Sequence, residues 1–265
     1  MKKYDVLIAD PAGNITAIVL NKDIEKSDYI SIAGKLMNIK KYGIEQVGFV
    51  RDPEIGGAPR LEMMGGEFCG NATRSFGLYV AADKYKVGEH VVKVEISGSS
   101  HALEVETNIE SGFARTSMPI PKKVDKIDLN SKFSLTVIVF EGIVHVIVLN
   151  EESNYELFKK VKPAVMDKYD PEAFGLIFLD AAAQKVTPIV HVKKTGSVVY
   201  ENSCGSGTVA AAIYLSENLM NGTYTCNISN PGGIIESEIH KSEGKVTKAF
   251  IGGKVKLSQI KHLMI

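Results

Sequence analysis

Two cysteines of this chain stand in near-identical settings. Cys69 begins the segment Cys-Gly-Asn-Ala-Thr, and Cys204, 135 residues later, begins Cys-Gly-Ser-Gly-Thr. Each is predicted to precede a helix, whose first backbone N–H groups lack partners within the helix and whose dipole places about half a positive charge there. Such a helix start binds a carboxylate and favours a nearby thiolate. The pattern therefore predicts proton transfer by two thiols next to a carboxylate.

Two thiols on opposite faces of one carbon could invert its configuration. We expect a substrate carboxylate between the backbone amides of Gly70–Asn71 and Gly205–Ser206, with the α-carbon between the two sulfurs. One thiolate would remove the α-proton, the opposite thiol would supply another, and the amides would stabilise the developing enediolate charge. We also expect each helix start to lower its thiol pKa from about 8.5 towards neutrality. This chemistry requires no metal or redox group, so we expect no cofactor.

The elements around the two cysteines recur in the same order. Helices are predicted at 71–85 and 208–219, and the strand ends Ile96-Ser97-Gly98 and Ile228-Ser229-Asn230 follow them at an offset of 132. Two nearly equal offsets indicate two copies of one α/β unit. We expect domains at 1–122 and 123–255, joined by the proline-containing stretch 119–128, with residues 256–265 returning to the first domain.

The remaining pattern fills in both copies. The first is predicted to open with a hairpin of strands at 6–9 and 15–20, and to continue with a helix at 27–40 that Ser27 or Asp28 caps. The second is predicted to contain helices at 155–166 and 171–174 between strands. The expected fold class is α/β (α+β), with two pseudo-symmetric domains, each a mixed sheet wrapped around a central helix.

Composition narrows the classes of partner. The chain has 265 residues, enough for two compact domains, and its 31 basic residues balance 31 acidic ones. A balanced charge argues against nucleic acid and anionic membranes as partners. No apolar run reaches the roughly 18 residues that a membrane span needs. Three cysteines cannot all pair, which favours reduced thiols in the cytoplasm.

Several motifs together resemble the diaminopimelate epimerase superfamily. The similarity covers essentially the whole chain and is carried by four segments: Pro11-Ala12-Gly13-Asn14, Glu67 to Thr73, Glu201 to Thr208, and Pro231-Gly232-Gly233. It implies a duplicated epimerase-like fold, one catalytic cysteine in each half, independence from pyridoxal phosphate, and a homodimer as the common assembly.

Within that superfamily the chain is more similar to the cofactor-independent histidine racemases of metallophore biosynthesis. Diaminopimelate epimerases typically have glycine where this chain has Ala72. They also carry a Glu-Arg pair well before the second cysteine, whereas this chain runs directly from Glu201 to Cys204 with no arginine. The segment from Gly142 to His145 also lacks their asparagine. The resemblance implies that Asn14 contacts the substrate. Glu45 would face an imidazole or would be a solvated strand residue. Glu201, beside the second motif, is a candidate substrate-binding residue or a solvated charge at a strand end.

Other chemistry-bearing residues have simpler interpretations. Cys226 lies in an apolar strand and is expected to be a buried hydrophobe, and His145 and His191 are expected to be core histidines. The stretch from Gly205 to Ala210 fits a dinucleotide-binding pattern, but no acid follows about 20 residues later and the first cysteine motif would stay unexplained. Neither histidines nor cysteines show zinc-ligand spacing.

The favoured function is therefore cofactor-independent racemisation of an amino acid, with histidine as the favoured substrate. Diaminopimelate epimerisation is the alternative within the same class. A phenazine-biosynthesis-like isomerase would share the fold without needing both cysteines. A non-catalytic protein that clamps an amino acid between the two helix starts is the alternative outside enzymes.

Overall fold

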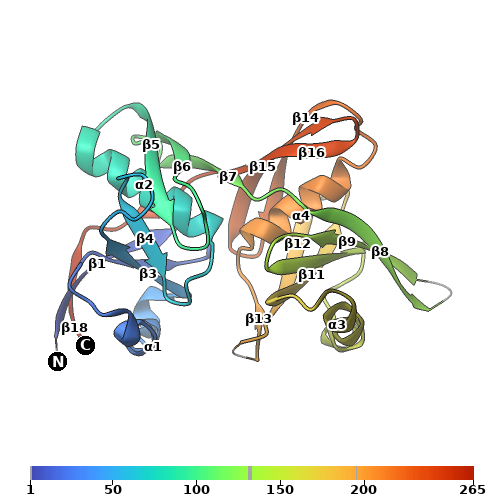
Figure 1. Ribbon diagram of the computed structural model, residues 1–265, viewed down its shortest axis with the longest axis horizontal. Coiled ribbons are helices and arrows are strands. Elements are labelled where there is room, and N and C mark those ends of the chain that lie inside the picture. The colour runs from blue at the N-terminus through green and yellow to red at the C-terminus, as the bar shows by residue number, and fades with distance from the viewer. Residues whose placement is uncertain (1, 131–132, 195) are drawn as a thin grey trace. The chain divides into compact units, whose positions relative to one another are not determined.

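The computed structural model describes residues 2–130, 133–194 and 196–265. The chain folds as two compact units, one reaching Ser117 and also containing Gly252–Ile265, the other Met118–Ile251 (Figure 1). These limits differ by a few residues from the expected 122/123 and 255/256. Hydrogen bonds explain the difference. The N–H of Lys122 binds the Val139 carbonyl, which ties the residues before 123 to the second unit. The N–H of Val255 binds the Gly112 carbonyl, which ties the residues before 256 to the first unit.

The first unit is a mixed sheet with two helical crossovers. Its strands are β1 (Lys3–Asp10), β2 (Thr16–Val19), β3 (Gln46–Arg51), β4 (Arg60–Met63), β5 (Glu89–Ile96), β6 (Leu103–Asn108), β7 (Phe113–Met118), β17 (Lys256–Leu257) and β18 (Lys261–Met264). They run in spatial order from β17 and β18 through β1 to β7. The β2–β3 and β4–β5 pairs are parallel, so each needs a crossover, supplied by α1 (Tyr29–Met37) and α2 (Gly70–Tyr85).

The second unit repeats this topology. Its strands are β8 (Lys123–Asn130), β9 (Phe133–Val139), β10 (Ile143–Leu149), β11 (Ala173–Asp180), β12 (Lys185–Val192), β13 (Ser197–Tyr200), β14 (Gly222–Asn230), β15 (Gly233–Ser242) and β16 (Lys245–Gly252). The parallel pairs β10–β11 and β12–β14 enclose α3 (Tyr155–Tyr169) and α4 (Gly205–Leu215). Antiparallel pairs β9–β10, β11–β12 and β14–β15 match β1–β2, β3–β4 and β5–β6. The shared topology supports an internal duplication.

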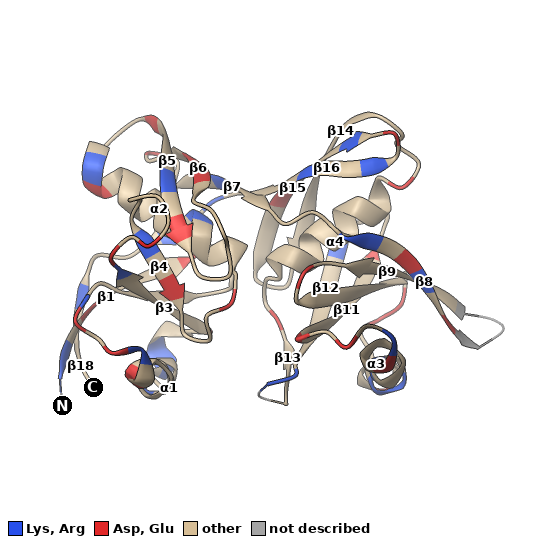
Figure 2. Cartoon of the chain, viewed as in Figure 1, with Lys and Arg blue, Asp and Glu red and all other residues tan. Residues whose placement is uncertain are grey.

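The second helix of each unit is central to its sheet. Helix α4 has no charged side chain, as Figure 2 shows, and packs against β10, β11, β12, β14 and β15. A helix that is apolar all round belongs in a core. Helix α2 packs closely on β5 and β6, since a Cβ on Gly77 would lie 2.5 Å from the Cβ of Val105. The expected arrangement of sheets around central helices is confirmed.

Some local predictions are correct and others are wrong. The opening hairpin is confirmed by β1 and β2, and the helix expected at 27–40 is α1. Asp28 occupies its N-cap position, but its side chain forms no capping hydrogen bond. The helix expected at 171–174 is wrong, because β11 begins at Ala173 and pairs there with Val192. The stretch 119–128, expected to be a linker, is not irregular throughout, because β8 begins at Lys123 within it.

In the described ranges, no helix is both long and apolar enough to cross a membrane.

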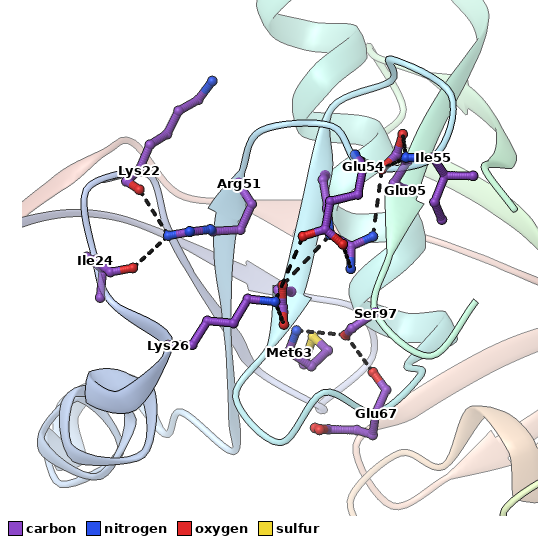
Figure 3. A network of polar contacts seen from close by, with 12 residues as sticks. Lys22, Ile24, Lys26, Arg51, Glu54, Ile55, Met63, Glu67, Glu95 and Ser97 are labelled. Carbon is purple, nitrogen blue, oxygen red and sulfur yellow. Dashed lines mark hydrogen bonds and ion pairs between the residues drawn. The ribbon is translucent and has the colours of Figure 1, made fainter. Parts of the chain in front are cut away.

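A buried carboxylate holds the loop before β4. Glu95 of β5 is fully buried and accepts the backbone N–H groups of Glu54, Ile55 and Gly56 at 2.7–3.0 Å (Figure 3). The Arg60 guanidinium lies 3.7 Å from the same carboxylate. Burial by itself would raise the pKa of Glu95, but the backbone hydrogen bonds and Arg60 hold it below its ordinary value.

Replacing this carboxylate should destabilise the first unit. We expect Glu95→Gln to lower the free energy of unfolding by about 2 kcal/mol, because charge-assisted hydrogen bonds are lost in a buried site. A lowered folded-state pKa contributes stability above the ordinary carboxyl pKa, and that contribution is lost as the pH falls through the folded-state value. The difference in free energy of unfolding between parent and variant, measured by urea unfolding, should therefore be largest at pH 7 and should decrease in acid. The control is Glu104→Gln, which removes an exposed ion pair with Lys93. Its free energy of unfolding should stay within about 0.5 kcal/mol of that of the parent. A pH-independent gap would contradict this account.

Candidate active site

Cys69 is the N-cap residue of α2. Its backbone is extended, and its Sγ accepts the backbone N–H of Ala72 at 3.4 Å. Thr73 donates both its backbone N–H, at 2.9 Å, and its hydroxyl, at 2.8 Å, to the Cys69 carbonyl. The sulfur therefore takes the place of the side-chain oxygen that usually caps a helix, and lies where helix N–H groups favour a thiolate.

The turn after β5 fixes the backbone that leads into Cys69. The Oγ of Ser97 accepts the Met63 N–H at 2.9 Å and donates to the Glu67 carbonyl at 2.8 Å (Figure 3). Gly98 has a φ of +74°, and any Cβ there would collide with the backbone nitrogen of Phe68. This turn is one half of the repeated pair of strand ends seen in the sequence.

Asn14 and Glu45 lie together near the start of β3. The Nδ2 of Asn14 donates to Oε2 of Glu45 at 3.3 Å, and the Oδ1 of Asn14 accepts from Nε2 of Gln46 at 2.6 Å. The same Gln46 nitrogen lies 2.7 Å from the hydroxyl oxygen of Thr16. The amide of Asn14 is therefore fixed with its nitrogen towards a carboxylate. Gln46 is a member of this cluster that sequence patterns did not single out.

Cys204 is the N-cap residue of α4 and matches Cys69. Its Sγ accepts the Gly207 N–H at 3.3 Å, and its carbonyl accepts the Thr208 N–H at 2.9 Å. Asn230 secures both ends of this turn, since its Oδ1 accepts the Cys204 N–H at 3.2 Å and its Nδ2 donates to the Thr208 hydroxyl at 3.1 Å. Asn230 ends β14, as Ser97 follows β5, so the repeated strand end holds the cysteine turn in both units.

The Cys204 thiol is buried and is protonated at neutral pH. Burial, followed by the charge of Glu201 and a hydrogen bond to its side chain, raises the pKa of Cys204 well above its ordinary value. The Gly207 N–H and the Ser206 hydroxyl lower the pKa by less. The expectation that the helix start brings this thiol towards neutrality is therefore wrong, because desolvation outweighs the helix start.

Ser206 connects Cys204 to a buried histidine. Its Oγ lies 3.7 Å from the Cys204 Sγ and 2.8 Å from Nε2 of His145 on β10. Burial lowers the pKa of His145 to about 3, so the ring is neutral. Any Cβ at Gly175, its partner on β11, would collide with the ring. His145 is buried as expected of a core histidine, yet it contacts Ser206, which lies two positions after the second cysteine.

The structure thus forms two groups of the predicted site residues, one in each unit. In the first unit these residues, called the N-terminal group, are the contacting pair Asn14 and Glu45 and, at the α2 start, Cys69, Gly70 and Asn71. The C-terminal group is Glu201, Cys204, Gly205 and Ser206. Cys226 is buried in β14 with its pKa raised to about 11 by burial, and His191 is buried with Nδ1 2.9 Å from the Ser197 carbonyl oxygen. In the described part of the chain, no three His, Cys, Asp or Glu side chains could hold a metal ion.

The two thiols should differ in reactivity. Cys204 is 5% exposed and protonated at neutral pH, whereas Cys69 is partly exposed. Because the thiolate is the nucleophile, we expect iodoacetamide to modify Cys69 at least about tenfold faster than Cys204 at pH 7.5. Because the pKa of Cys204 is raised, its modification rate should keep increasing with pH across the alkaline range without levelling off. Peptide mass spectrometry after timed labelling measures both rates. Equal rates at pH 7.5 would contradict the protonation state assigned to Cys204.

Comparisons with known proteins identify the family and the fold. Residues 5–260 match the family described as the histidine racemase CntK N-terminal domain. A histidine racemase of Fusobacterium nucleatum subsp. nucleatum is 32% identical over 261 residues, covering 96% of this chain and 93% of that protein. A histidine racemase of Staphylococcus aureus is 27% identical, covering 85% of each. Among solved structures, a predicted epimerase from Pseudomonas aeruginosa has a TM-score of 0.69 and 11% sequence identity, and the match covers 99% of both chains. A probable proline racemase from Agrobacterium radiobacter has a TM-score of 0.68 and 11% sequence identity, and the match covers 100% of this chain and 93% of that one. These structures share the fold.

Proposed function

We propose that this chain, which belongs to the histidine racemase family, interconverts the L and D forms of histidine without pyridoxal phosphate. The observation that carries the proposal is the matched pair of N-cap cysteines. Each sulfur accepts the N–H of the residue three positions later, at 3.4 Å for Cys69 and 3.3 Å for Cys204. Sequence family, fold and local geometry therefore support the same chemistry.

In the proposed reaction, one cysteine acts as base and the other as acid on a single α-carbon. The backbone amides at Gly70–Asn71 and Gly205–Ser206 would receive the substrate carboxylate, as helix starts commonly do. They would then stabilise the negative charge that moves onto the carboxylate when the α-proton leaves. Because the base and the acid lie on opposite faces, removal of the α-proton by one thiolate and delivery of a proton by the other thiol together invert the α-carbon.

The resting protonation of Cys204 suits it to the acid role. Its raised pKa leaves a proton on sulfur at neutral pH, and Ser206 lies close enough to support the thiolate left behind after that proton is given up. Glu201 can take part in returning the thiol to its starting state, because its side chain is hydrogen-bonded to Cys204. We therefore propose that the first turnover uses Cys69 as the base and Cys204 as the acid.

The choice of histidine rests on the family and on the N-terminal group. Two relatives at 32% and 27% identity are histidine racemases. The Glu45 carboxylate, with Asn14 donating to Oε2, can accept a hydrogen bond from an imidazole N–H. We propose that Asn14 and Glu45 bind the side chain of the substrate while the helix starts bind its carboxylate.

A panel of L-amino acids tests this function. Chiral chromatography should show D-histidine formed from L-histidine, and L from D, reaching equal amounts of the two forms. Turnover of diaminopimelate but not histidine would overturn the substrate and indicate the epimerase alternative. Binding of histidine without turnover of any amino acid would overturn the enzymatic assignment and indicate an amino-acid clamp.

We propose a reducing compartment such as the cytoplasm, because both thiols must stay free for this chemistry. Cys69, Cys204 and Cys226 form no disulfide in the structure. We propose a homodimer, as the superfamily resemblance implies, with no nucleic acid partner. Light scattering on the purified protein, with and without added DNA, tests both statements.

A further inference from the structure

A fully buried arginine lies one turn into α2. Arg74 is 0% exposed, and its guanidinium donates hydrogen bonds to a side chain and to several backbone carbonyls. Nε binds Oδ1 of Asn71 at 3.2 Å, and Nη2 binds the Pro11 carbonyl at 2.8 Å. Nη1 binds the carbonyls of Gly253 at 3.1 Å and Lys254 at 3.5 Å. A guanidinium remains charged at all ordinary pH values, so these are charge-assisted bonds.

These acceptors belong to three segments that are distant in the sequence. Asn71 is the second residue of α2 and adjoins the amides expected to bind the carboxylate. Pro11 begins the turn that ends at Asn14, the residue that faces Glu45. Gly253 and Lys254 follow the point where the chain re-enters the first unit. One side chain therefore connects the start of α2, the Asn14 turn and the returning C-terminal segment.

We infer that Arg74 is a positioning residue, which holds Asn14 and Asn71 at the spacing needed to bind an amino acid next to Cys69. The inference rests on the proposed function and adds a residue that acts through Asn14 and Asn71. Its chemistry is specific to arginine, because a planar fork can donate in several fixed directions at once, whereas a lysine ammonium is a single point donor.

Arg51 provides a comparison within the same unit. Its Nη1 also donates to two backbone carbonyls, those of Lys22 at 3.0 Å and Ile24 at 2.6 Å (Figure 3). Neither acceptor belongs to a segment that carries a predicted site residue. Arg51 thus also connects backbone carbonyls through its guanidinium, but these carbonyls are not in segments of the N-terminal group. Arg51→Lys is therefore the matched control for Arg74→Lys.

The inference predicts a defect in substrate binding that Arg51→Lys does not share. We expect Arg74→Lys to lower kcat/KM for L-histidine about tenfold, mostly through KM, since ligand positions shift by a fraction of the roughly 1 Å that costs about 100-fold. Arg74→Gln, which is neutral but keeps amide donors, should show the same KM-dominated defect. Both are assayed below the temperature at which circular dichroism detects unfolding. Arg51→Lys should stay within about twofold of the parent.

Repeating the Arg74→Lys substitution in a second variant protein distinguishes a positioning role of Arg74 from general destabilisation of the fold. In a protein that already carries Asn14→Ala and Asn71→Ala, the residues through which Arg74 is inferred to act are gone. Arg74→Lys should then cause less than about a twofold further loss in kcat/KM, because coupled residues do not have additive effects. A tenfold loss in both backgrounds, or no loss in the parent background, would overturn the inference while leaving the racemase assignment intact. A parent protein inactive on every amino acid would overturn both.

Discussion

Either Cys69→Ser or Cys204→Ser is expected to reduce racemisation by about 1,000-fold or more. A hydroxyl is a far weaker acid and base than a thiol near neutral pH, and positioned acid–base catalysis contributes about 10²–10⁴-fold. Both cysteines cap their helices through the side chain, and serine can accept the same N–H from Ala72 or Gly207. The fold should therefore survive while the proton transfer fails. Initial rates by chiral chromatography, with circular dichroism as a check of folding, measure this.

Cys226→Ala is the matched control for these variants. Cys226 is equally a free cysteine, but it is buried in β14 and has no place in the proposed reaction. It should retain activity within about threefold of the parent, at a modest cost in stability. Retention of parental rates by a folded Cys69→Ser or Cys204→Ser protein would show that the substituted thiol is not needed.

The second large effect is expected from a single methyl group. A Cβ at Gly207 would lie 2.8 Å from Cδ1 of Ile177 and 3.1 Å from the Cys204 Sγ. Ile177 is fully buried, and the contact with the sulfur is itself tighter than an ordinary van der Waals contact, so both the Ile177 side chain and the Cys204 sulfur must move. We expect Gly207→Ala to lower kcat about 30-fold, because the sulfur moves by part of the roughly 1 Å displacement that costs about 100-fold. The backbone itself should tolerate alanine, which favours helix by about 1 kcal/mol.

The first unit supplies the reciprocal control, because Ala72 occupies the equivalent position after Cys69. Ala72→Gly removes a methyl group without pushing on the sulfur. It should lower helix stability by about 1 kcal/mol and leave kcat within about threefold. Stopped assays of both variants at saturating histidine make the comparison. An active Gly207→Ala protein with an unchanged labelling rate at Cys204 would contradict the steric explanation.

The cysteine turns could be predicted from the sequence because their determinants are local. A Cys-Gly pair between a strand and an apolar helix indicates an N-cap, and the equal spacing of Cys69 and Cys204 indicates a duplication that the matching strand pairings support. The helix predicted at 171–174, where the structure has the start of β11, shows that local sequence does not always determine the element. Ala173 and Phe174 have no strong preference of their own, and their pairing with β12 decides the strand.

The features that the sequence did not predict depend on contacts between distant segments. His145 and Ser206 are 61 residues apart, and Arg74 meets Pro11 and Gly253 across 63 and 179 residues. An arginine in a helix is normally exposed, so no pattern signals that this one is buried. The raised pKa of Cys204 has the same origin, because the helix start is visible in the sequence whereas burial and the contact with Glu201 arise only on folding.

Racemisation of L-histidine in deuterium oxide tests the central claim of two thiols acting on opposite faces. Thiol protons exchange rapidly with solvent, so the acid delivers deuterium while the base carries away the original proton. In the first few per cent of reaction, mass spectrometry should find every D-histidine molecule deuterated at the α-carbon and the remaining L-histidine unlabelled. D-histidine that retains the substrate's own α-proton, or L-histidine that gains deuterium as fast as the D form appears, would show a single base on one face and contradict the account.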